Sequence, residues 1–76
     1  MDNLAASLGN LLRELRQKKG ISQEALAADS DLDRTYISMV ERGERMPTIR
    51  TLFKISRGLD IKPSGILRDL EQRVDF

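Results

Sequence analysis

The side chains best suited to chemistry in this 76-residue sequence follow Asp33, in a stretch with helical spacing. At about 3.6 residues per turn, Ile37, Val40 and Glu41 share one side of that helix and point inward. The opposite side carries hydroxyls, a thioether and basic groups: Thr35, Ser38, Met39 and Arg42, with Arg34 at the N-terminal end and Tyr36 at the flank. Such a face suits the base edges of DNA, because arginine pairs with guanine, hydroxyls pair with several bases, and an apolar group meets the thymine methyl.

Basic residues are concentrated in the same part of the chain. Between positions 34 and 57, six basic residues accompany two acidic ones, although the whole chain has a net charge of only +1. The basic residues are Arg34, Arg42, Arg45, Arg50, Lys54 and Arg57, and the acidic ones are Glu41 and Glu44. This uneven distribution predicts one surface that faces an anion.

Composition excludes several classes of function. The sequence contains no Cys and no His, which excludes thiolate and imidazole metal sites, Cys nucleophiles and His-dependent triads. Acids and a hydroxyl are present at Glu24, Asp29 and Ser30, but neither clustered carboxylates nor a glycine-rich phosphate loop accompanies them. We therefore expect no enzyme, no cofactor and no small-molecule ligand.

The same composition bears on partners and location. One Tyr and two Phe supply no stacking platform for RNA. No apolar run approaches the roughly 20 residues that cross a bilayer, and the first residues lack the features of a signal peptide. We therefore expect a cytoplasmic protein with no membrane partner.

Apolar spacing predicts a single all-α domain over residues 1–76, a compact five-helix bundle. The first three helices are expected at residues 3–19, 23–28 and 33–42, with a turn over residues 29–31. A fourth begins at Pro47 and Thr48, and a fifth runs over residues 63–74. Gly20 and Gly43 are expected to end helices, and Ser22 and Asp33 to cap them.

Several separated runs resemble the phage repressor and Cro class of helix-turn-helix regulators. They are GISQEALA from Gly20, LDRTYIS from Leu32, ERG from Glu41 and PTI from Pro47. The length, the five helices and the run LDRTYIS-x-x-ERG also resemble the controller proteins of restriction–modification systems. The resemblance, over about residues 8–67, implies a transcriptional regulator that binds a palindromic double-stranded DNA operator as a homodimer. RNA polymerase would be a further partner if the protein activates.

The resemblance also implies roles for individual residues. It implies a phosphate contact for Gln23 and an internal ion pair between Arg16 and Glu41. Base contacts are implied for Arg34, Thr35, Ser38 and Met39, and backbone contacts for Tyr36, Arg42 and Arg45. Two positions depart from the family pattern, because Asp31 stands where Gly is frequent in the turn and Met39 stands where a polar residue is frequent.

Simpler interpretations stay open for several of these residues. The arginines could form an ordinary solvated helix face, and Gln23 could be merely exposed in a first turn. Tyr36 could pack against the first helix, and Met39 could be a passive surface residue. An antitoxin-like protein-interaction module on the same scaffold is the alternative function, although few residues follow Val74 to form a neutralising extension.

The fifth helix presents a choice between core and interface. Its apolar residues could fold back, together with Phe76, to complete the core of one chain. Because the other helices already supply core material, the sequence favours a two-fold interface built by the fourth and fifth helices. The residues expected there are Phe53, Ile66, Leu67, Leu70 and Val74. Such a dimer would place two recognition helices one turn of DNA apart, about 34–36 Å.

Overall fold

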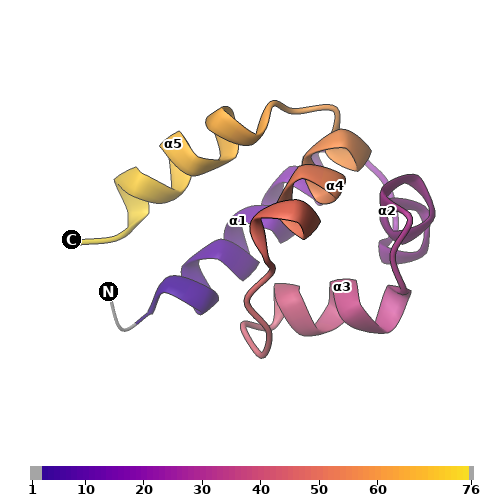
Figure 1. Ribbon diagram of the computed structural model, residues 1–76, viewed down its shortest axis with the longest axis horizontal. Helices are drawn as coiled ribbons and strands as arrows, with labels where there is room; N and C mark the ends of the chain where they lie inside the picture. Colours follow the sequence, from indigo (N-terminus) through magenta and orange to yellow (C-terminus); the bar gives the residue numbers. More distant parts are fainter. Residues whose placement is uncertain (1–2, 76) are drawn as a thin grey trace.

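The computed structural model describes residues 3–75, which form five α-helices and contain no strand (Figure 1). The helices are α1 (Leu4–Lys19), α2 (Gln23–Ser30), α3 (Arg34–Glu41), α4 (Ile49–Leu59) and α5 (Pro63–Arg73). The predicted all-α, five-helix fold is therefore confirmed. None of the described helices is both long and apolar enough to cross a membrane.

Local chemistry explains where most helices begin and end. The backbone of Gly20 is left-handed, with a φ of 79°, and its N–H donates to the carbonyl oxygens of Arg16 and Gln17. The hydroxyl of Ser22 accepts from the N–H of Ala25 at 3.0 Å, as expected of an N-cap. Thr48 caps α4 in the same way, and Pro63 occupies the first turn of α5.

The turn expected over residues 29–31 is misplaced. Asp29 and Ser30 belong to α2, and only Asp31 leaves the helix, in a left-handed conformation with a φ of 56°. Ser30 is completely buried, and its hydroxyl lies where a Cβ on Gly58 of α4 would have to go. Packing against α4 therefore keeps Ser30 helical, and Asp31 makes the reversal that Gly often makes because aspartate tolerates this conformation.

Smaller differences affect other helix ends. α3 ends at Glu41, with Arg42 as its C-cap, and α5 ends at Arg73 rather than Val74. α4 begins at Ile49, after the Thr48 cap. Asp33 occupies the N-cap of α3 without a side-chain hydrogen bond to the helix.

The long helix α1 is the centre of the packing. It contacts α3, α4 and α5, while α2 packs against α3 and α4. Every helix contributes to one buried core, formed by Leu8, Leu11, Leu12, Leu26, Ala27, Ile37, Val40, Leu52, Ile55, Leu59, Ile66 and Leu70. In Figure 1, α3 runs along the lower edge of the molecule, below α4.

Two residues that were expected at the dimer interface are buried in the core of one chain. Ile66 is 0% exposed and Leu70 is 8% exposed, so both belong to the core of one chain rather than to an interface. The reason is that α5 folds back on α1 and α4, where these two side chains close the bundle. Val74 is partly buried against the same core, and Phe76 lies outside the described residues. Only Leu67 of the expected α5 residues is well exposed.

Candidate nucleic-acid interface

α3 has one face locked into the protein and one face open to solvent. Ile37, Val40 and Glu41 are all buried, as their spacing predicted. On the other side Thr35 is exposed, and Ser38 and Met39 are half-buried. Because the inner face is held by the core, the polar outer face is rigidly presented for binding.

A buried carboxylate holds α3 against α1. The Nε and Nη2 atoms of Arg16 donate to the two carboxylate oxygens of Glu41 at 2.7 and 3.0 Å, and Nη1 of Arg16 donates to the carbonyl of Ile21 at 2.9 Å. The side chain of Glu41 is 1% exposed and that of Arg16 is 13% exposed. The hydrogen bond to Glu41 raises the pKa of Arg16 above its ordinary value, so the guanidinium stays charged.

The same carboxylate also holds α2. Nε2 of Gln23, the first residue of α2, donates to Oε1 of Glu41 at 3.1 Å, and Arg13 of α1 lies 3.8 Å from that oxygen. Sequence reasoning expected the ion pair with Arg16 but missed these two further neighbours of Glu41. Helices α1, α2 and α3 are therefore joined through Glu41, and Gln23 has an internal partner that orients its amide.

Arginines lie at both ends of α3. At the N-terminal end, Nε of Arg34 is 3.5 Å from a carboxylate oxygen of Glu24 on α2, and both side chains are exposed. At the C-terminal end, Nε and Nη2 of Arg42 donate to the two oxygens of Glu44 at 2.8 and 3.1 Å, and Nη1 donates to the Ser38 hydroxyl. Sequence reasoning assigned no role to Glu44 and did not foresee this contact.

The remaining candidates, Tyr36 and Arg45, lie together. The guanidinium carbon of Arg45 is 5.4 Å from the centre of the Tyr36 ring, a cation–π distance. Tyr36 is half-buried and packs against the edge of the core. The ring therefore packs against the core and lies beside an exposed cation, and its contact with the first helix stays a prediction.

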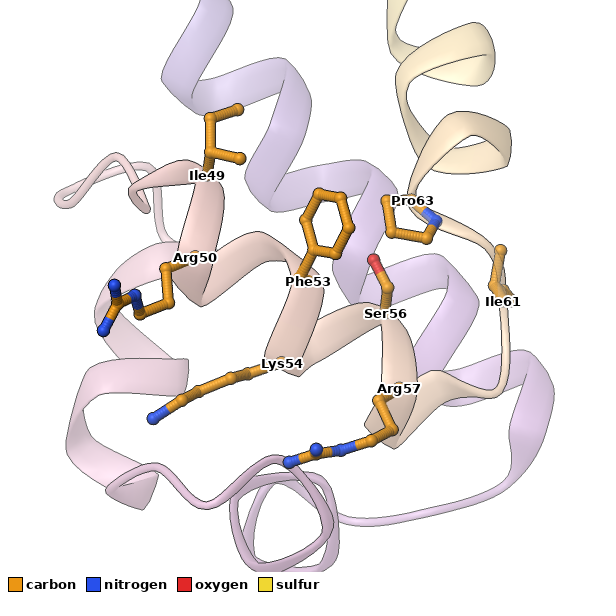
Figure 2. Close-up of a pocket in the computed structure, with 8 residues that line it drawn as sticks. All are labelled: Ile49, Arg50, Phe53, Lys54, Ser56, Arg57, Ile61 and Pro63. Atoms are coloured by element: carbon orange, nitrogen blue, oxygen red, sulfur yellow. The ribbon is translucent and has the colours of Figure 1, made fainter.

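A second exposed feature lies on α4 and at the start of α5. Ile49 is 66% exposed and Phe53 is 57% exposed, and both line an open groove of about 700 Å³. Ile61 and Pro63 complete its apolar part, and Arg50, Lys54, Ser56 and Arg57 supply the rest of its lining. Figure 2 shows the Phe53 ring projecting toward Pro63, whereas the three basic side chains of α4 extend away from Pro63. We call the surface formed by Ile49, Phe53, Ile61 and Pro63 the α4 groove. Leu67, one helical turn after Pro63, is 45% exposed.

The arrangement of α2 and α3 matches known proteins. A family model described as helix-turn-helix matches residues 12–66. The chain belongs to the helix-turn-helix family. The control protein C.MunI from Mycoplasma sp is 44% identical over 73 residues, which cover 95% of this chain and 99% of that protein.

Solved structures agree with this membership. The restriction–modification controller protein C.AhdI from Aeromonas hydrophila superposes with a TM-score of 0.81 at 44% identity, covering 87% of this chain and 98% of its own. The controller protein C.Esp1396I, solved as a tetramer in complex with its natural 35 base-pair operator, superposes with a TM-score of 0.84 at 38% identity, covering 91% of each chain. Within the helix-turn-helix family, this chain therefore belongs with the restriction–modification control proteins, whose likeness extends through α5 and not only the matched helix-turn-helix segment.

Proposed function

We propose that this helix-turn-helix protein regulates transcription by binding a palindromic DNA operator as a homodimer, with α3 in the major groove. The observation that carries this function is α3 itself, whose inner face is buried and whose outer face offers hydroxyls, a thioether and arginines. The structure of C.Esp1396I as a tetramer on its operator supports an oligomer on DNA for this chain, which is 38% identical to it. A cytoplasmic location suits both this ligand and the absence of cysteine.

Within this function, the candidate side chains divide into those that read bases and those that contact the DNA backbone. We assign bases to Arg34, Thr35, Ser38 and Met39, which lie at the N-terminal end or on the outer face. We assign phosphates and sugars to Gln23 at the start of α2, Tyr36 within α3, Arg42 at the C-cap of α3 and Arg45 in the segment after it. Base contacts specify a sequence and phosphate contacts position the protein on it.

Selection from random duplex DNA tests this proposal directly. We expect enrichment of one sequence made of two inverted half-sites, with centres about 10–10.5 base pairs apart. Recovery of no enriched duplex, or of a single unrepeated element, would contradict operator binding by a dimer.

Arg34→Ala is expected to relax the preference for one base pair in each half-site, at a cost of about 1–3 kcal/mol per half-site. The matched control is Arg45→Ala, which removes an equal charge and is expected to weaken the selected duplex and a shuffled duplex by the same factor, because phosphates are common to both. Competition binding with duplexes altered at single positions measures both effects. If Arg34→Ala also weakened both duplexes equally, Arg34 would not be a base reader.

The α4 groove and Leu67 form the surface that we assign to the dimer. This surface keeps Phe53 and Leu67 from the expected interface and adds Ile49, Ile61 and Pro63. It leaves out Ile66 and Leu70, which are buried in one chain, and Val74, which is partly buried against the same core. Exposed apolar side chains of this size, gathered on α4 and the start of α5, lose unfavourable contact with water when a second copy covers them. A two-fold axis would present the same groove twice.

Phe53→Asp is expected to produce a folded monomer that binds the selected duplex no better than a single half-site. The charge would be desolvated against its symmetry mate, whereas an exposed side chain contributes little to the fold of one chain. Circular dichroism measures the helical content, sedimentation measures the oligomeric state, and binding titrations measure the affinity for the selected duplex and for a single half-site. Asn10→Asp, which adds the same charge to an exposed position of α1, is the control. A Phe53→Asp protein that remained dimeric would place the interface elsewhere.

A further inference from the structure

All three guanidinium nitrogens of Arg42 are engaged within the chain. Two of them donate to the carboxylate of Glu44, at 2.8 and 3.1 Å, and the third donates to Ser38. Both side chains of the Arg42–Glu44 pair are about half exposed, so solvent and a ligand can reach them. The pair lies at the C-terminal end of α3, beside the outer face that we assign to DNA.

The geometry of this pair resembles that of an arginine on a phosphate. A guanidinium binds a carboxylate or a phosphate through two parallel N–H···O bonds, using the same edge. The oxygens of Glu44 therefore occupy the position that two phosphate oxygens would take on the Nε–Nη2 edge of Arg42. A phosphate can use that edge only after the carboxylate leaves it.

We propose that Glu44 is an intramolecular phosphate mimic, which occupies Arg42 in the DNA-free protein and thereby lowers the affinity for duplex DNA of any sequence. This inference rests on the proposed function, because it assumes that Arg42 meets the DNA backbone. Glu44 thus raises the protein concentration at which binding begins.

Two further observations support masking of Arg42 in particular. The other arginine at an end of α3, Arg34, approaches its glutamate only at 3.5 Å, whereas Arg42 is held through two short hydrogen bonds. The hydrogen bond from Arg42 also lowers the pKa of Glu44 below its ordinary value, so the carboxylate stays charged at neutral pH. The mask is therefore present under the conditions in which the protein would meet DNA.

Masking predicts a particular dependence on salt. In the parent, Arg42 reaches a phosphate only by leaving Glu44, and the freed carboxylate retains a cation that offsets one released counterion. When Glu44 is neutral, this offset is absent in each subunit. The slope of log affinity against log salt should therefore become steeper by about 0.9 for each subunit when Glu44 loses its charge.

The test compares Glu44→Gln with Glu14→Gln. Glu14 makes a similar two-bond pair with Arg73, at 2.8 and 2.9 Å, but on α1 and α5, so its substitution changes the net charge equally without exposing a group of α3. The probes are the duplex recovered by selection and a shuffled duplex of the same length, each titrated at several salt concentrations. We expect Glu44→Gln to bind both duplexes about twofold to fivefold more tightly per subunit, with the steeper slope. Glu14→Gln should match the parent in slope.

A second comparison separates masking from simple repulsion between Glu44 and DNA. In an Arg42→Gln background, Glu44→Gln should have no larger effect than Glu14→Gln, since no guanidinium remains to be released. An effect that persists in this background, or a Glu44→Gln protein that binds like Glu14→Gln or more weakly than the parent, would overturn the inference while leaving the proposed function intact. A parent protein that bound neither duplex would contradict the proposed function and the inference together.

Discussion

Glu41→Ala is expected to lower the free energy of unfolding by about 3–5 kcal/mol, a large share of the stability of a small domain. The substitution leaves the guanidinium of Arg16, 13% exposed, without the carboxylate to which it donates twice. It also removes the acceptor of the Gln23 amide, so α1, α2 and α3 lose their shared contact. Urea unfolding followed by circular dichroism, at one fixed protein concentration, measures the loss.

Glu14→Ala is the matched control for this prediction. It breaks an arginine–glutamate pair of similar geometry in which Glu14 is well exposed, and such solvent-exposed pairs contribute little to stability. The large loss of unfolding free energy should therefore depend on whether the pair is buried and not on the number of its hydrogen bonds. Equal losses for the two variants would show that Glu41 does not carry the role assigned to it.

Gly9→Ala is expected to cost about 1–3 kcal/mol or more and to weaken DNA binding. A Cβ at position 9 of α1 would lie 2.6 Å from the carbonyl oxygen of Glu41 and would also collide with that of Val40. Both obstacles are backbone atoms at the end of α3, so the helix must shift relative to α1. Thermal unfolding measures the first effect, and titration with the selected duplex measures the second.

Gly65→Ala tests whether the Gly9 effect comes from this close approach. The nearest atom to a Cβ at position 65 is a methyl carbon of Ile61 at 3.5 Å, an ordinary contact. Since alanine favours helix over glycine by about 0.8–1.0 kcal/mol in helix interiors, Gly65→Ala in α5 should be neutral or stabilising. If both variants lost stability to the same extent, close packing of α1 on α3 would not be the reason for Gly9.

The sequence by itself determined the number of helices, most of their ends and the inner face of α3. These properties depend on residues close together in the chain. Ser22 caps a backbone N–H three residues away, Gly20 makes a local reversal, and the spacing of Ile37, Val40 and Glu41 sets one side of a helix. Local sequence also placed the candidate DNA-binding side chains on the opposite side, although their contacts with DNA stay predictions.

Only the tertiary structure decided which element covers the apolar face of each helix and which polar side chains form hydrogen bonds with each other. Periodicity shows that one side of α5 is apolar, but it does not distinguish a second chain from α1 of the same chain, and Ile66 and Leu70 proved to face their own core. Packing against Gly58 likewise kept Ser30 in α2. The Gln23–Glu41 contact joins residues 18 positions apart, and the Arg42–Glu44 pair depends on how the chain leaves α3. Both depend on the path of the chain in space, which propensity and spacing along the sequence do not specify.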